Sequence, residues 1–370
     1  MTDTMREFMT TWHTSPRPYM ASWSTRNKSN TMQSTTSTDF VPYFRAFDLL
    51  AMPNQALTLF ENSDQRIGVE SVCGAQDEFR RHVDFDTVYF QFAGTTTIES
   101  EYGEYVMKPG ELTLIPEGIA HRSTGSADSL RWFAFVNEPF TEFMDESSYT
   151  GESEFRVIRH NGPNWKIPAG KEQPKKGGMV EERMICWDHD ESAATIAKRD
   201  YDYLVGGTSL DIGEKKSGIR LIRIFDIFFK VAGKAGGVPP IFQSRHCRME
   251  TYNISGEQFA YHRALRSEEL RIQFRGEAID MSELENVHIS PGGATLIPRG
   301  ISHGLLTDPP DSPLFLRFNI LTDLRWHYPN DLTRHVFDST FETQTIIRKE
   351  AAWRIEAGLV VQPLETAGRV

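Results

Sequence analysis

The chain has 370 residues, a length typical of two domains, and its hydrophobic share of 39% with 24 Phe, 11 Tyr and 7 Trp can fill two cores. A net charge of −11 argues against nucleic-acid and anionic-membrane partners, because phosphate binding needs clustered Lys and Arg. Cys73, Cys186 and Cys247 are far apart and form no CxxC pair, which indicates a reducing, cytoplasmic setting without disulfides or a thiolate zinc site. No apolar run has the length of a transmembrane span, so we expect no membrane partner.

Residues 1–38 are rich in Ser and Thr and carry no signal-peptide pattern. We expect an N-terminal arm that is disordered or straps the fold; a transit segment is the alternative. Residues 39–140 are expected to form a first β-barrel. Its predicted strands are Thr87–Phe92, Thr95–Ser100, Tyr105–Met107 and Leu112–Ile115, with a tight turn at Tyr102–Glu104.

Residues 141–240 are expected to connect this barrel to a second one at residues 241–325. Within the connection we predict a short helix at Glu191–Lys198, a strand at Ile219–Val231 and a solvated loop at Trp187–Asp190. Residues 326–370 are expected to be a helical extension, because Thr343–Leu359 has helical periodicity.

The chain contains an internal repeat. Gly110–His121 and Gly292–His303 share the frame GxxTLIPxGIxH, with an offset of 303 − 121 = 182. The offset is again 182 between Thr87 and Glu269 and between Gly94 and Gly276. A constant offset across several positions predicts a duplicated domain.

The second barrel carries a candidate metal site made of His262, Glu269 and His303. Two imidazoles and one carboxylate are typical of a facial iron(II) site with open coordination positions, although the ligands alone do not choose iron over manganese. Strand alternation puts Glu269 on one face with Arg271 and Gln273. Glu268 is the alternative carboxylate, and two core histidines without metal are the alternative to the site as a whole.

The first barrel has His82 and His121, but Thr87 stands where the carboxylate belongs. Asp86 is next to Thr87, yet the pleat points it the other way. We therefore expect the first barrel to be metal-free.

These motifs resemble those of cupins: a His-x(5–6)-Glu-x6-Gly motif followed by Gly-x5-Pro-x-Gly-x2-His. The resemblance implies an all-β bicupin, with two double-stranded β-helix (jelly-roll) barrels and a C-terminal helix. More specifically, the chain is similar to the homogentisate 1,2-dioxygenase family. The similar segments are Tyr261–Arg263, Ser267–Glu269, Pro291–Gly304, Asp86–Gly94 and Glu101–Glu111.

That resemblance implies an Fe(II)-dependent dioxygenase that cleaves the ring of a phenol and inserts both atoms of O2. Two positions depart from the family: the spacing from His262 to Glu269 is one residue longer, and Ile297 stands where the family carries a histidine that contacts the phenol. Hydroquinone- or salicylate-like substrates are therefore as well supported as homogentisate. The expected partners are a small aromatic substrate, O2, further copies of the chain in a homo-oligomer, and in some hydroquinone-type relatives a small second subunit.

The remaining candidate residues surround the second motif. His246 and Tyr261 are candidate bases for the phenol, and Arg271, Gln273 and Arg299 are candidate substrate contacts. Arg271 has an alternative role as a buried ion-pair partner of Glu269. Two other function classes stay open, a non-catalytic cupin that binds an aromatic ligand and a manganese or zinc cupin isomerase or decarboxylase.

Overall fold

The computed structural model describes residues 10–13, 43–45, 54–143, 155–158, 178–188, 194–201, 218–223, 241–253, 261–264, 266–275, 278–282, 286–289, 291–307, 314–321 and 325–326. Every element bounded within these ranges is a β-strand, so the predicted all-β class is confirmed. None of the described residues belongs to a helix long and apolar enough to cross a membrane. The helix expected at Thr343–Leu359 lies outside the described residues.

The chain divides into two compact units. The N-barrel comprises residues 46–141 and 145–227, and the C-barrel comprises residues 1–45, 142–144 and 228–370. The C-barrel thus takes in the start of the chain, including two short strands from the arm and the segment after it, β1 (Thr10–His13) and β2 (Tyr43–Arg45).

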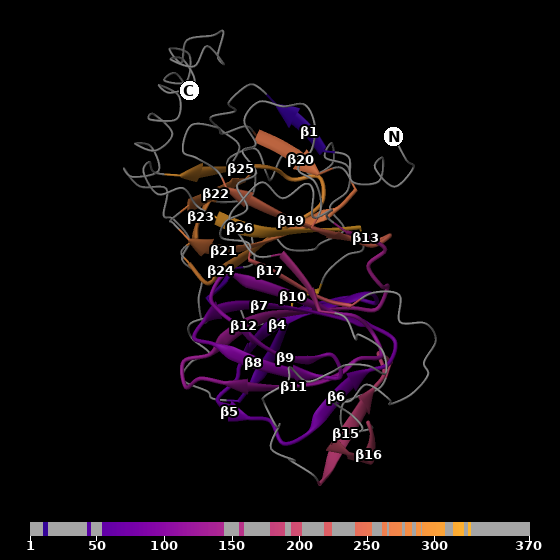
Figure 1. Ribbon diagram of the computed structural model, residues 1–370. Helices are drawn as coiled ribbons and strands as arrows, with labels where there is room; N and C mark the ends of the chain where they lie inside the picture. The colour runs from indigo at the N-terminus through magenta and orange to yellow at the C-terminus, as the bar shows by residue number, and fades with distance from the viewer. Residues whose placement is uncertain are drawn as a thin grey trace, which may run out of the picture. The chain divides into compact units, whose positions relative to one another are not determined.

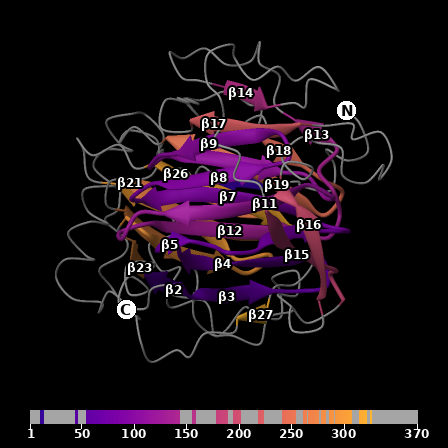
Figure 2. The ribbon, with the colours of Figure 1, turned by 60° about the horizontal axis from the view of Figure 1, so that its bottom comes forward.

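The N-barrel consists of two antiparallel sheets with one parallel addition. The first sheet has the order β14-β17-β10-β7-β12-β4-β3, seen nearly face-on in Figure 2. The second has the order β16-β15-β6-β11-β8-β9, with β5 beside β11 and β15 parallel to β6. The bounds are β3 Ala56–Glu61, β4 Gln65–Ser71, β5 Gly74–Ala75, β6 Phe79–His82, β7 Asp86–Ala93, β8 Thr96–Ser100, β9 Gly103–Met107, β10 Glu111–Ile115, β11 Ala120–Gly125, β12 Leu130–Val136, β14 Phe155–Ile158, β15 Met179–Ile185, β16 Thr195–Asp200 and β17 Ile219–Arg223.

The C-barrel also consists of two sheets. One has the order β13-β18-β19-β26-β21-β24-β2 and the other β1-β20-β25-β22-β23, in which Figure 1 shows β1 beside β20. The bounds are β13 Glu142–Phe143, β18 Phe242–Gln243, β19 Cys247–Asn253, β20 Tyr261–Ala264, β21 Glu268–Arg275, β22 Ala278–Ser282, β23 Asn286–Ile289, β24 Gly293–Ile297, β25 Ser302–Thr307, β26 Leu314–Ile320 and, at the end of the described chain, β27 Arg325–Trp326.

In both barrels the chain changes sheet in the same order. Strands β4, β7, β10 and β12 lie in one sheet while β6, β8, β9 and β11 lie in the other, and β19–β26 repeat this sequence of changes. Two facing sheets linked in this way make a jelly roll, the architecture expected for a cupin.

The repeat in the sequence is a repeat of strands. Strand β7 begins at Asp86 and β21 at Glu268, an offset of 268 − 86 = 182, and both strands are 8 residues long. The same offset relates β4 to β19, β6 to β20, β8 to β22, β10 to β24 and β11 to β25 at both ends. Two strands differ: β23 starts 286 − 103 = 183 residues after β9 and ends at the common offset, and β26 starts 314 − 130 = 184 residues after β12, so two residues are added before it.

The glycines of the repeated motif have matching backbone angles. Gly110 and Gly292 have φ of 87° and 83°, and Gly118 and Gly300 have φ of 75° and 79°. Glycine adopts this left-handed region without strain, whereas other residues do not. The motif glycines are thus required by the turns before β10 and β11 and before their counterparts β24 and β25.

Two predictions for the connecting segment were wrong. The segment predicted as helix at Glu191–Lys198 contributes instead to β16, which pairs with β15. Ala197 and Lys198 favour helix, but pairing with a neighbouring strand overrides that weak preference. Trp187, predicted in a solvated loop, is 4% exposed and packs against Phe85, with ring centroids 5.6 Å apart.

Candidate metal centre

The C-barrel backbone brings the two predicted imidazole ligands to adjacent strands. Strands β20 and β25 are antiparallel, and His262 is the register partner of His303. The side chain of His262 is not among those described. The register alone places both positions side by side in one sheet, as two ligands of a single ion require.

Glu269 lies close to His303 across the barrel interior. Its strand, β21, belongs to the sheet that faces the one containing β25. Glu269 Oε2 is 3.4 Å from His303 Nε2, and the two side chains are 1% and 0% exposed. Two donors about 2.1 Å from one ion at right angles would be about 3 Å apart, close to this separation. The pair therefore fits two neighbouring ligands.

The ring of His303 is held by the backbone. Its Nδ1 is 2.9 Å from the carbonyl oxygen of Ile301. When Nδ1 donates its proton to that carbonyl in the neutral imidazole, Nε2 keeps the lone pair that a metal needs. Metal-ligating histidines commonly make this second hydrogen bond, which fixes the tautomer and the ring.

Glu269, rather than the alternative Glu268, is the carboxylate next to His303. Glu268 is also fully buried, but it pairs with Ile320 one register position away from the Glu269–Asn319 pair. Successive strand residues point to opposite faces. The carboxylate chosen from motif spacing is thus the one that the fold brings to the histidine.

Arg271 contacts the same carboxylate. Its Nε donates to Glu269 Oε1 at 2.7 Å, and its Nη1 donates to Asp280 Oδ1 at 2.9 Å. Burial would lower the pKa of Arg271, but Asp280 and Glu269 outweigh it and raise that pKa above its ordinary value. Asp280 is held in turn by Thr295, whose Oγ1 donates to Oδ2 at 3.0 Å. These contacts correspond to the ion-pair alternative for Arg271.

The other predicted site residues are less closely assembled. Gln273 is buried on β21, two residues beyond Arg271, and its carbonyl accepts a hydrogen bond from Gly292. Arg299 Nη2 donates to the carbonyl of Leu321 at 2.8 Å. His246 is half-buried before β19, and Tyr261, on β20, is the register partner of His13. The structure thus places Gln273 on the strand of Glu269 and ties Arg299 to a backbone carbonyl.

Ile297 lies next to the candidate carboxylate ligand. It is buried and is the register partner of Glu269. Ile297, at the position where the sequence resemblance led us to compare a phenol-contacting histidine, therefore lies on the strand next to the candidate carboxylate ligand and presents no hydrogen-bonding group.

No group of three or more His, Cys, Asp or Glu suited to a metal occurs among the described side chains. Within that part of the chain Glu269 and His303 form a pair, and His262 would be the third member. The donor set of this triad, two imidazole nitrogens and one carboxylate oxygen, fits a divalent transition metal.

The N-barrel differs from the C-barrel at every ligand position except one. His121 corresponds to His303 and makes the same contact, with Nδ1 3.1 Å from the carbonyl of Ile119. Its register partner, however, is Arg80, which takes the place of His262. His82 is two residues further along, at the position of Ala264, since 264 − 82 = 182.

The two buried histidines of the N-barrel contact uncharged hydroxyl groups. His82 contacts the hydroxyl of Thr87, and Tyr89 Oη is 3.4 Å from His121 Nε2. Burial lowers the pKa of His121 to about 3 and that of His82 well below its usual value. Both rings are therefore uncharged at neutral pH, and neither contacts a carboxylate.

Asp86 does not substitute for Thr87. Its two carboxylate oxygens accept backbone hydrogen bonds from Glu117 and Phe140, both at 2.9 Å. Burial raises the pKa of Asp86 to about 6 despite these bonds. The side chain thus supports two loops, as the pleat argument requires.

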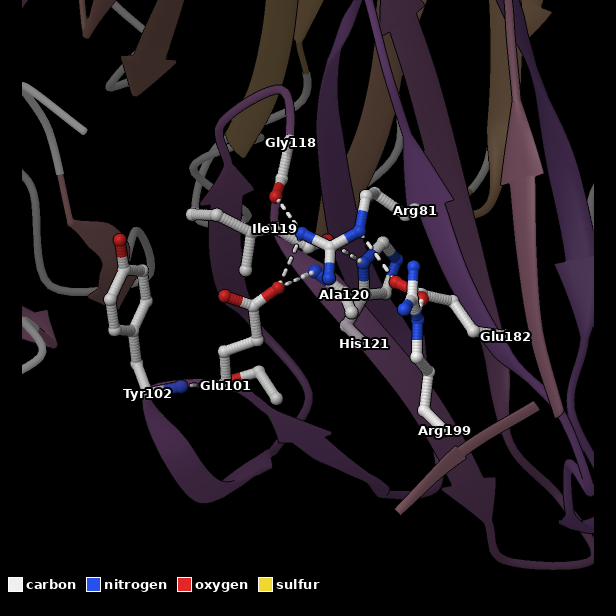
Figure 3. Close-up of polar contacts among 10 residues, drawn as sticks. Arg81, Glu101, Tyr102, Gly118, Ile119, Ala120, His121, Glu182 and Arg199 are labelled. Carbon is white, nitrogen blue, oxygen red and sulfur yellow. Dashed lines mark hydrogen bonds and ion pairs between the residues drawn. The ribbon is translucent and has the colours of Figure 1, made fainter. Parts of the chain in front are cut away.

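A second buried charge network braces the N-barrel. Arg81 lies between Glu101 and Glu182, at 2.5 Å from each, and also contacts the carbonyl of Gly118 (Figure 3). Glu182 lies on β15 and accepts a further hydrogen bond from Arg199 at 2.9 Å. This network connects β15 and β16 to β6.

No family profile matches the sequence, and no curated protein matches it. Solved structures do resemble the chain. A cupin 2 conserved barrel domain protein from Leptotrichia buccalis has a TM-score of 0.41 at 9% identity, covering 75% of this chain and 96% of that one. A salicylate 1,2-dioxygenase from Pseudaminobacter salicylatoxidans has a TM-score of 0.44 at 12% identity, covering 82% and 92%. Likenesses this distant carry no argument about activity, which must come from the residues of the site.

Sequence reasoning missed Asp280 and Thr295. Asp280 is a single acid between apolar neighbours on a short strand, and Thr295 lies inside the repeated TLIP frame. An acid flanked by Ile279 and Met281 on a predicted inner strand is the signal that could have marked this position.

Proposed function

We propose that the protein is a non-haem Fe(II)-dependent dioxygenase that cleaves the ring of a phenolic substrate and inserts both atoms of O2. The observation that carries the proposal is the 3.4 Å approach of Glu269 Oε2 to His303 Nε2, with His262 as the register partner of His303. Homogentisate-, hydroquinone- and salicylate-like phenols are the substrate classes, and Ile297 in place of a phenol-contacting histidine makes homogentisate no more favoured than the others.

In this proposal His262, Glu269 and His303 hold the metal. Bound iron(II) would supply open coordination positions for a phenol and O2, and orienting both reactants at one site would favour their reaction. His303 is prepared for this role because its Nδ1 is engaged by Ile301. Glu269 Oε1 accepts a hydrogen bond from the Arg271 guanidinium at 2.7 Å.

The remaining tasks fall to groups around the site. A bound phenol must lose its hydroxyl proton, and His246 and Tyr261 are the proposed acceptors. Gln273 and Arg299 are the proposed substrate contacts. The buried side chains of Glu269, Arg271 and His303 exclude water, which strengthens the electrostatic interactions of the site. We further propose a homo-oligomer and, for a hydroquinone-like substrate, a small partner subunit.

Oxygen uptake tests the proposal directly. Full-length protein purified without oxygen and loaded with iron(II) would be assayed with homogentisate, hydroquinone, gentisate, salicylate and a catechol. We expect uptake with one of them and loss of the ring absorbance, and we expect both to disappear in His303→Ala. Iron-loaded protein that consumes no oxygen with any of them would contradict the proposal and favour an oxygen-independent cupin isomerase or decarboxylase, or an aromatic-binding protein.

A further inference from the structure

We propose that Arg271 and Asp280 are positioning residues for the metal centre, which hold Glu269 so that one carboxylate oxygen faces His303. The inference rests on the proposed metal site and adds two residues that would not touch the metal.

The geometry forms a chain of buried contacts that ends at Glu269. Thr295 donates to Asp280 Oδ2, and Asp280 Oδ1 accepts from Arg271 Nη1. Arg271 Nε then donates to Glu269 Oε1 at 2.7 Å. The side chains of Arg271 and Asp280 are 3% and 0% exposed, so solvent does not screen these ion pairs. Three residues on strands β21, β22 and β24 thereby fix one rotamer of Glu269.

As a consequence, the two carboxylate oxygens of Glu269 make different contacts. Oε1 accepts the guanidinium, while Oε2 is the atom 3.4 Å from His303 Nε2. An ion held there would receive one oxygen from Glu269 rather than two. A single-oxygen ligand leaves more of the coordination sphere for a substrate.

Asp280 has a second effect, which is to neutralise the charge of Arg271. A lone arginine beside a metal ligand would repel a divalent cation, but Asp280 neutralises Arg271. The cluster of Glu269, Arg271 and Asp280 therefore carries a net charge of −1 in its ionised form, the charge of one ligand carboxylate.

The N-barrel provides an internal comparison. At the offset of 182, Thr87 replaces Glu269, Tyr89 replaces Arg271 and Ile98 replaces Asp280. Tyr89 and Ile98 belong to a hydrophobic cluster of that barrel. The supporting arginine and aspartate are absent from the barrel that lacks the carboxylate, as expected if they serve it.

The experiment is a titration of metal-stripped full-length protein with Co(II). Binding is measured by calorimetry, and the environment of the bound ion is measured by its visible ligand-field absorption. The variants are Arg271→Met and Asp280→Asn. The matched control is Arg131→Met, because Arg131 is an equally buried arginine in the N-barrel whose Nε is 2.5 Å from Glu70 Oε1. Urea unfolding of each apo variant reports its stability separately.

We expect Arg271→Met and Asp280→Asn to bind Co(II) about 10- to 100-fold more weakly, the usual effect of losing such an outer partner, with an altered spectrum. Arg131→Met should lose stability but keep wild-type affinity. Asp280→Asn keeps the side-chain shape, so it tests the inference even if Arg271→Met does not fold. Wild-type affinity in both variants would overturn the positioning role while the metal centre stands; wild-type protein that binds no Co(II) would overturn the metal centre and this inference together.

Discussion

Arg80 is the register partner of His121 in the N-barrel, at the position that His262 occupies as partner of His303 in the C-barrel. A long cationic side chain thus stands where one imidazole ligand would be needed. Together with Thr87 at the carboxylate position, this leaves the N-barrel with one of the three donors in its matching place. The two barrels therefore share their strands, but only the C-barrel has all three candidate metal donors at the matching positions.

Glutamine substitutions at two adjacent positions should separate the ligand from its neighbour. Glu269→Gln removes the charge next to His303, and we expect Co(II) affinity to fall by about 100-fold or more, because a charged ligand is replaced by a neutral one. Glu268→Gln should change that affinity by less than about threefold. Calorimetric titration of both variants measures the difference, and the reverse ranking would make Glu268 the ligand.

The stability of the N-barrel should fall in acid because of its buried histidines. The folded pKa of His121 is depressed from 6.5 to about 3, so its contribution is present above pH 6.5 and is lost as the pH falls from 6.5 toward 3. In this pH range His121 is protonated in the unfolded chain but not in the folded chain. The free energy of unfolding therefore falls by about 1.4 kcal/mol for each pH unit of acidification.

Urea unfolding between pH 6.5 and pH 4.5 measures this slope. His121→Gln should remove about 1.4 kcal/mol per pH unit from it. Asp86 titrates in the opposite sense, since its raised pKa favours the folded state at low pH, and it is present in both proteins. An unchanged slope in His121→Gln would mean that the ring is protonated in the folded state.

Two glycines with positive φ should respond differently to alanine. At Gly94, with φ of 60°, an added Cβ would lie 2.7 Å from the carbonyl oxygen of Asp128; at Gly74, with φ of 78°, it would meet nothing within 4 Å. Gly74→Ala should cost about 1 to 2 kcal/mol for backbone strain alone. Gly94→Ala should cost about 2 kcal/mol more, because the backbone must also shift. Equal losses in thermal unfolding would show that the turn at Gly94 adjusts freely.

Truncation of the arm should weaken the metal centre. β20 has two register pairs with β25 but four with β1, from Thr10 to His13. Deleting residues 1–15 removes most of the backbone pairing of the strand that carries His262, and we expect about tenfold weaker Co(II) binding for the loss of about 1.4 kcal/mol. Deleting residues 1–9 leaves β1 and should leave affinity unchanged, so equal binding by both truncations would contradict this expectation.

The sequence predicted the inner strands well because their signals are local. Alternation around Thr87–Phe92 and the turn glycines at 103 and 110 located β7 to β10 to within about two residues. The pairing of Glu269 with His303 followed from motif spacing. The repeat offset of 182 also leads from His262 to Arg80 rather than to His82, although the histidine motif alone favoured His82, and the strand register agrees with the offset. Side-chain contacts that depend on strand pairing have no such signal in the sequence.

The contacts that support Glu269 were not predicted, because they depend on how the strands pair in the folded barrel. Asp280 and Arg271 lie on strands of different sheets, so only the folded barrel brings the two charges together. The misassigned segment around Ile196 shows the converse, since a helical composition was overridden by pairing with β15.

Strand β6 of the N-barrel and its counterpart β20 of the C-barrel each have one edge covered by an additional strand, but the two covering strands are unrelated. β6 is covered by β15 in parallel, whereas its counterpart β20 is covered by β1 in antiparallel orientation. An uncovered edge strand exposes unpaired backbone groups and invites aggregation between chains. The duplication therefore supplied two barrels with the same vulnerable side, and each was closed with a different piece of the chain, drawn from the far N-terminus in one case and from the inter-barrel connection in the other.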